Sequence, residues 1–281
     1  MISFSTIFGD LKRHARARFD LYQREKPNDI LLITTGIQFA LMVIMLVALP
    51  LDSRLVSGVN PWIKPIKFTQ SIAAYVLTLA WLLDYLRISR WGKQILSWGA
   101  SICVLTQMGC ITLQAARGTT SHFNMSSPFD KTISILMDVM DPVGSIFMIA
   151  LLVLACRGKF AVSRPVQWGI VSGLVIFLWA SAIGAIMVVQ GSHSVGGGAG
   201  DDGAGLPILN WSTTGGDLRP AHFLGLHALQ ILPIIGWLLN LWGGLSMRVK
   251  LAGVVATALG VAALITFLFY QAMHGIPFVR V

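Results

Sequence analysis

The chain has 281 residues, of which 55% are hydrophobic and 12% are charged, and its mean hydropathy is +0.72. A soluble domain of this length would carry about twice that charged fraction, so the composition excludes an ordinary soluble protein and predicts a polytopic membrane protein. The formal net charge of +9 would suit nucleic acid, but membrane proteins collect Lys and Arg in their cytoplasmic loops. We therefore expect no nucleic-acid partner and a lipid bilayer as the surrounding medium.

Residues 1–29 are predicted to form a basic amphipathic helix on the cytoplasmic face of the membrane. Apolar side chains recur at helical spacing between Phe4 and Tyr22, and six Lys and Arg residues fill much of the remaining surface. This pattern is typical of a helix that lies on anionic lipid, although a disordered basic tail would have a similar composition. No apolar run follows the start, so we expect no cleaved signal peptide.

Residues 30–281 are predicted to form one transmembrane domain. An α-helix needs about 20 apolar residues to cross the hydrocarbon core of a bilayer, and seven stretches of the chain meet this requirement. No internal repeat is visible, so the sequence does not predict an inverted-repeat transporter. We therefore expect an all-α, seven-transmembrane-helix bundle with spans near 30–50, 67–87, 94–116, 133–155, 166–190, 220–241 and 250–273.

The distribution of Lys and Arg predicts which way this bundle faces. If the N-terminus is cytoplasmic, 14 of the 21 Lys and Arg residues fall on the cytoplasmic side, as the positive-inside rule requires. Seven spans then place the C-terminus outside, and we expect the protein in a bacterial inner (plasma) membrane. The longest outer connection, 191–219, contains the Gly-rich sequence GGGAGDDGAG, which suits either a lid or a slack linker.

Histidines gather at the predicted outer ends of the spans. Four of the six lie there: His122, His222, His227 and His274. His227 lies seven residues past Pro220, about 10 Å along the helix axis, at a depth where an ionisable side chain suggests a functional site. His222 and His227 point about 140° apart, so they are poor joint ligands for one small ion. The remaining histidines, His14 and His193, are assigned to the basic tail and to a flexible loop.

Acidic and amide side chains are expected near the same level of the membrane. Asp138 and Asp141 share one face of the fourth span, where carboxylates are costly unless they are paired, hydrogen-bonded or protonated. With His227 they form our candidate catalytic group, although a purely structural ionic network is the alternative. Seven further side chains are candidates for binding a substrate: Lys64, Lys67, Arg117, Arg219, Gln230, Gln271 and Asn124.

Three functions fit this outward-facing polar site. The leading prediction is a membrane oxidoreductase that depends on a divalent metal or haem b, because neutral imidazoles are good metal ligands. Its candidate ligands are His227, His274, His122 and His222, but no compact metal motif supports them. The second prediction is a small-molecule (anion) binding protein or a proton-coupled transporter. The third is a cofactor-free hydrolase or transferase that acts on a lipid substrate, with histidine as the base.

Overall fold

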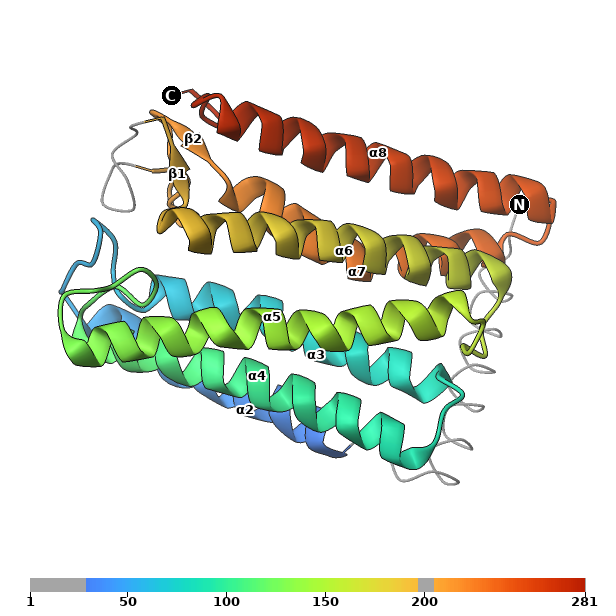
Figure 1. Ribbon diagram of the computed structural model, residues 1–281, viewed down its shortest axis with the longest axis horizontal. Coiled ribbons are helices and arrows are strands. Elements are labelled where there is room, and N and C mark those ends of the chain that lie inside the picture. Colours follow the sequence, from blue (N-terminus) through green and yellow to red (C-terminus); the bar gives the residue numbers. More distant parts are fainter. Residues whose placement is uncertain (1–28, 197–204, 281) are drawn as a thin grey trace.

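The structure of this protein is a computed structural model that describes residues 29–196 and 205–280 (Figure 1). It contains seven helices long and apolar enough to cross a membrane, so the chain is an integral membrane protein. The predicted interfacial helix at residues 1–29 lies almost wholly outside the described residues, as does most of the Gly-rich sequence in the connection after the fifth span.

The seven predicted spans are confirmed in order. The long helices are α2 (Asp29–Ala48), α3 (Ile63–Tyr85), α4 (Arg90–Arg117), α5 (Pro128–Cys156), α6 (Arg164–Gln190), α7 (Arg219–Leu241) and α8 (Met247–Met273). A short 3-10 helix, η1 (Leu49–Leu51), follows α2. Helices α3, α4 and α5 begin four or five residues earlier than predicted, because their first turns contain polar residues that hydropathy does not count.

Side-chain caps and glycines fix where several helices begin and end. The hydroxyls of Ser89, Ser127 and Ser246 accept hydrogen bonds from the first-turn amides of α4, α5 and α8, which satisfies donors that have no partner within the helix. Gly118 and Gly191 end α4 and α6 in the left-handed conformation, which glycine adopts without a steric penalty.

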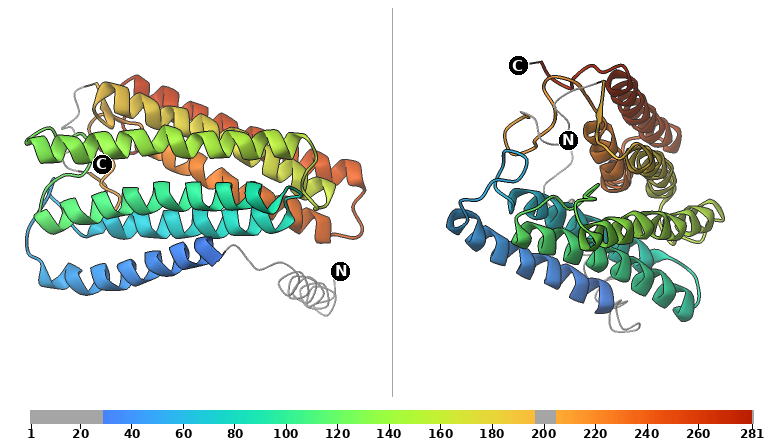
Figure 2. Two further views of the ribbon diagram at one scale, coloured as in Figure 1. Left: turned by 60° about the horizontal axis from the view of Figure 1, so that its bottom comes forward. Right: turned by 60° about the vertical axis from the view of Figure 1, so that its left-hand side comes forward.

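The helices form an up-and-down bundle in two groups (Figures 1 and 2). Helices α2, α3 and α4 pack together, α6, α7 and α8 pack together, and α5 contacts both α4 and α6. The ends of α2, α4, α6 and α8 meet the starts of α3, α5 and α7 at one end of the bundle (Figure 1). We call this the histidine end, because the loops and helix ends there contain His122, His193, His222 and His274.

The hydrophobic core divides toward the histidine end. At the opposite end, one cluster joins helices from both groups, including Leu83 of α3, Leu151 of α5 and Ile170 of α6. Toward the histidine end there are two separate clusters. One belongs to α2, α4 and α5 and contains Met108, and the other belongs to α6, α7 and α8 and contains Ile183. Toward the histidine end, each group of helices therefore has its own hydrophobic cluster.

Helices α6 and α7 approach each other unusually closely, because glycines line their contact. A Cβ atom added at Gly169 would lie 2.4 Å from the carbonyl oxygen of Leu232, and one added at Gly236 would lie 2.4 Å from that of Pro165. Small residues let neighbouring membrane helices bring their backbones together and gain van der Waals contact. This interface holds the helix that carries His222 and His227 firmly against α6.

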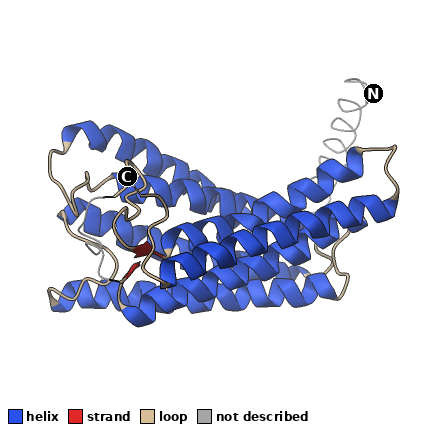
Figure 3. Cartoon of the chain, turned by 90° about the horizontal axis from the view of Figure 1, so that it is seen from above, coloured by secondary structure: helices blue, strands red, loops and turns tan. Residues whose placement is uncertain are grey.

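The connection between α6 and α7 contains a short antiparallel pair of strands (Figure 3). Strand β1 (Ser194–Val195) pairs with β2 (Gly216–Asp217), and the amide of Leu218 donates a hydrogen bond to the carbonyl of His193. Both ends of the connection are therefore fixed. His193 lies directly before β1, at a paired end of the connection. Two-residue strands are too short to give a sequence pattern, so the sequence did not predict this pairing.

Candidate functional site

The loop that carries His122, residues 118–127, is organised by its own polar side chains. The amide nitrogen of Asn124 donates to the hydroxyl of Thr119 at 2.9 Å and to the carbonyl of Thr120 at 3.0 Å. Its amide oxygen accepts from the backbone and the hydroxyl of Ser126. Asn124 was a candidate for binding a substrate, but its hydrogen bonds are used to shape the loop.

Arg117 and Asp130 join the end of α4 to the start of α5. The buried carboxylate of Asp130 forms an ion pair with Arg117 and accepts hydrogen bonds from Gln114 and Ser127. The guanidinium of Arg117 also lies over the ring of Phe129, 4.7 Å from its centroid. Arg117 therefore positions the helices on either side of the His122 loop.

His122 lies in an aromatic group drawn from three segments of the chain. Its ring centroid is 5.9 Å from that of Phe68 on α3, 6.0 Å from that of Phe123, and 6.4 Å from that of His193. The hydroxyl of Ser121 lies 3.0 Å from its Nδ1 atom. Residues far apart in sequence thus bring two imidazoles side by side at the histidine end.

The electrostatic surroundings of His122 favour its neutral form. Burial, followed by the positive charges of Lys64, His193 and His222, holds the pKa of His122 well below its ordinary value of 6.5. All three neighbours carry charge of the same sign when protonated, so none of them stabilises an imidazolium. An anion bound next to His122 would reverse that effect.

His222 turns toward α6 and has a defined proton position. Its Nδ1 atom lies 2.7 Å from the carbonyl oxygen of Ala180, and a carbonyl can only accept, so Nδ1 carries a proton and donates it to this carbonyl. The ring lies over Gly184, where an added Cβ atom would come within 2.8 Å of its Cε1 atom. The glycine therefore provides the space that the imidazole occupies.

His227 connects α7 to α3. Its Nδ1 atom lies 3.2 Å from the amide oxygen of Gln230, and its Nε2 atom lies 3.4 Å from the hydroxyl of Ser71 on α3. The ring of Phe223 packs edge-on against it, with the centroids 4.6 Å apart. Ser71 was not among the predicted site residues, since a single serine in an apolar span gives no distinctive signal.

The predicted catalytic aspartates both lie in the first half of α5. Asp141 is exposed on the surface of the bundle and accepts a hydrogen bond from Gln107 of α4, while Asp138 is half-buried one turn earlier. Neither carboxylate is hydrogen-bonded to His227 in the part of the chain that the structure describes. The three residues are therefore not assembled as an acid–base group here.

Lys67 and Arg219 hold the connection between α6 and α7 in place. The ammonium of Lys67 donates to the carbonyls of Ile208 and Leu209 at 2.8 and 3.0 Å. Arg219 forms an ion pair with the buried Asp217 at 2.7 Å and donates to a backbone carbonyl of the same connection. Both basic side chains thus bring the connection over the start of α3 and α7.

His274 and Gln271 take part in the turn that follows α8. His274 is exposed, and its Nδ1 atom lies 2.8 Å from the carbonyl of Tyr270. The amide of Gln271 donates to the carbonyl of Pro277 at 2.6 Å. These contacts fold the C-terminal residues back on the helix, so the roles predicted for both side chains in ligand or substrate binding are not visible in the geometry.

The predicted metal ligands do not form one site. Among residues 29–196 and 205–280, no three His, Cys, Asp or Glu side chains lie close enough together to hold a metal ion. His222 and His227 extend toward different helices, and His274 contacts its own helix. Metal or haem dependence stays a prediction that this arrangement does not strengthen.

At the histidine end the structure instead brings three imidazoles close to Lys64. His122, His193 and His222 interact with one another through their charges, and Lys64 acts on the same group. Such an arrangement can accept protons and attract negative charge.

Comparison of the chain with protein-family models, with curated proteins and with solved structures finds no match.

Proposed function

We propose that this integral membrane protein binds a small anionic solute at its histidine end and takes up a proton on imidazole as it does so. The observation that carries the proposal is the balance of charge there. Three described carboxylates at this end each form an ion pair with an arginine. The pairs are Asp52–Arg54, Asp130–Arg117 and Asp217–Arg219. Lys64 and Lys67 add two further positive charges, so the described residues leave this end net positive.

The histidines give the proposed site its dependence on protons. His122 is held neutral by burial and by positive neighbours, so an anion that binds beside it would stabilise the imidazolium. Proton uptake and anion binding would then favour each other, as linkage requires. A proton-coupled transporter could use the same coupling, and binding is the step that both activities share.

The other two predicted functions receive no specific support from the geometry. A metal- or haem-dependent oxidoreductase would require ligands that face a common centre, whereas the hydrogen bonds of His227 go to Ser71 and Gln230. A cofactor-free hydrolase or transferase would require a histidine oriented by a carboxylate. Asp141 is instead hydrogen-bonded to Gln107. Both functions stay predictions.

A thermal-stability experiment tests the proposal. The detergent-purified protein is heated with increasing concentrations of inorganic phosphate, sulfate, nitrate, acetate or succinate, and unfolding is followed by tryptophan fluorescence. At a hundred times its Kd, a bound anion stabilises the native state by about 2.7 kcal/mol. We expect at least one of these anions to raise the Tm of the wild type.

Matched variants separate a specific site from a general salt effect. Lys64→Gln and His122→Asn should lose the anion-dependent rise in Tm. Lys159→Gln, the same substitution at an exposed position at the opposite end of the bundle, should keep it. If no anion stabilises the wild type, or if all three variants respond equally, the proposed function is wrong.

A further inference from the structure

Gln38 is a buried amide whose polar atoms have no partner. It lies near the middle of α2 with 0% exposure, and neither Nε2 nor Oε1 makes a hydrogen bond within the part of the chain that the structure describes. A glutamine inside a membrane bundle usually bonds to a neighbouring helix. Because Gln38 does not, helix packing leaves both its donor and its acceptor unsatisfied, which is unfavourable away from water.

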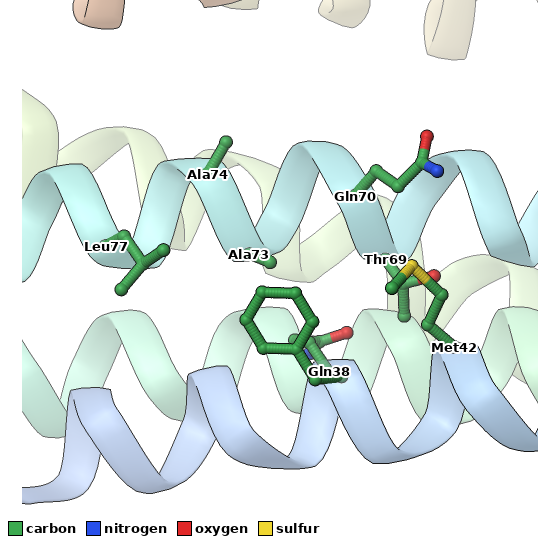
Figure 4. A pocket seen from close by; sticks show the side chains of 8 residues that line it. Gln38, Met42, Thr69, Gln70, Ala73, Ala74 and Leu77 are labelled. Carbon is green, nitrogen blue, oxygen red and sulfur yellow. The ribbon is translucent and has the colours of Figure 1, made fainter.

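The side chain of Gln38 faces a cavity between α2 and α3 (Figure 4). The cavity has a volume of about 270 Å³. The amide of Gln38 extends from α2 toward Thr69 and Ala73 of α3. Phe39, Met42 and Leu77 complete much of the apolar wall. This space adjoins the unpartnered amide, so a molecule in the cavity could supply the missing hydrogen bonds.

The chemistry of the wall restricts what the cavity can hold. None of the described residues that line it is charged, so a charged ligand would be left without a counter-charge. The hydroxyl of Thr69 donates to the carbonyl of Pro65 in its own helix at 2.7 Å and can therefore only accept from a ligand. One water occupies about 30 Å³, so a single water at Gln38 would leave most of the apolar volume empty. The occupant should be uncharged and mostly apolar.

The cavity opens toward lipid. Phe39 and Leu77, which stand on the outer side of α2 and α3, are 48% and 43% exposed. In a seven-helix membrane protein such exposed apolar side chains contact acyl chains rather than water. A ligand dissolved in the bilayer could therefore enter directly between the two helices.

We propose that this cavity binds an uncharged, lipid-soluble alcohol or phenol. A hydroxyl is the smallest group that accepts from Nε2 and donates to Oε1 of Gln38 at the same time, while a ring or short chain fills the apolar space beside Ala73. The site lies on α2 and α3 and does not depend on the proposed anion site, so either proposal can fail alone.

Photolabelling with a diazirine derivative of octanol tests the proposal on the full chain. Irradiation of the protein in detergent should attach the probe to residues of α2 and α3 that line the cavity, such as Phe39, Met42 and Leu77, as located by mass spectrometry. Excess 1-octanol should prevent this labelling, whereas octane, which lacks the hydroxyl, should not. Equal protection by the two competitors, or no labelling of these residues, would overturn the proposal.

Substitutions at the cavity provide the decisive comparison. Gln38→Leu keeps the size of the side chain but removes both hydrogen bonds, so labelling should fall about tenfold or more. Its Tm should equal or exceed that of the wild type, because two unpaired polar atoms are gone. Ala73→Leu fills the cavity from the side of α3 that faces Gln38, with Gln38 in place, and should also reduce labelling (Figure 4). Gln190→Leu, on an exposed position at the end of α6, should not. Unchanged labelling in both cavity variants would exclude the site.

Discussion

His122 and His193 lie with their ring centroids 6.4 Å apart, although one belongs to the loop after α4 and the other to the connection after α6. Burial and positive neighbours hold the pKa of His122 well below 6.5, whereas in the unfolded chain it titrates near that value. Between these two pKa values the unfolded chain binds a proton that the native protein does not, so stability rises with pH.

We therefore expect the Tm of the protein to fall as the pH is lowered from 7 to 5. His122→Asn should reduce the slope of stability against pH, to which a single group contributes at most about 1.4 kcal/mol per pH unit. Thermal unfolding in buffers of different pH measures this slope. Gln190→Leu, at an exposed position, is the control and should leave the slope unchanged, because neither side chain titrates. Identical slopes in both variants would show that His122 does not control the pH dependence.

Anion binding should become tighter as the pH falls. An anion next to His122 raises its pKa, so binding takes up protons, and each proton taken up strengthens binding about tenfold per pH unit. Calorimetric titrations with the stabilising anion, in two buffers of different ionisation enthalpy, measure the number of protons taken up per anion bound. We expect this number to be positive in the wild type and smaller in His122→Asn. A proton count of zero in the wild type would contradict coupling but not binding.

The absorbance spectrum of the purified protein tests the oxidoreductase prediction. Both ring nitrogens of His227 are hydrogen-bonded, and His274 is exposed beside its own helix. We therefore expect no Soret band and no stoichiometric metal. A haem or metal signal that disappears in His227→Ala or His274→Ala would instead establish the cofactor and identify its ligand.

The sequence was sufficient to predict the spans because burial in lipid imposes a long apolar run on every helix. It could not predict how close α6 and α7 would lie. A glycine such as Gly169 or Gly236 permits a close approach only where the backbone of another helix lies opposite, and the sequence does not show which backbone that is. The pairing of β1 with β2 was also missed. Strands of two residues are too short to show the alternation of apolar and polar side chains. The position of β2 depends on the close contact between Gly216 and the backbone of α8.

The site was predicted in outline only. His122 and His222 could be assigned to one end of the bundle from their place in the chain, but membrane depth does not tell which way a side chain points. Asp141 was expected to meet His227, and the structure places it on the surface beside Gln107. The Gly-rich sequence after His193 predicts a flexible loop, whereas the structure places His193 directly before the paired strand β1 and next to His122.

A C-terminal reporter should be active outside the cytoplasm. The start of α2 and the end of α8 lie at opposite ends of the bundle (Figure 1), as an odd number of spans requires. The positive-inside rule predicts a cytoplasmic N-terminus. Alkaline phosphatase fused after Val281 should therefore be active, and the same fusion after Arg157, between α5 and α6, should be inactive. The reverse pattern would show that the histidine end faces the cytoplasm.

Gly169→Ala should destabilise the protein far more than an alanine elsewhere in a helix. The new Cβ atom would lie 2.4 Å from the carbonyl oxygen of Leu232 and 2.9 Å from the Cα atom of Pro233. Backbone atoms cannot move aside as a flexible side chain can, so α6 and α7 must separate, at a cost of about 1–3 kcal/mol.

Gly109→Ala in α4 is the matched control, because nothing lies within 4 Å of its added Cβ, and alanine favours a helix more than glycine does. Thermal unfolding in detergent should show a lower Tm for the first variant and an equal or higher Tm for the second. If both retain the Tm of the wild type, the close contact between α6 and α7 does not hold the bundle together.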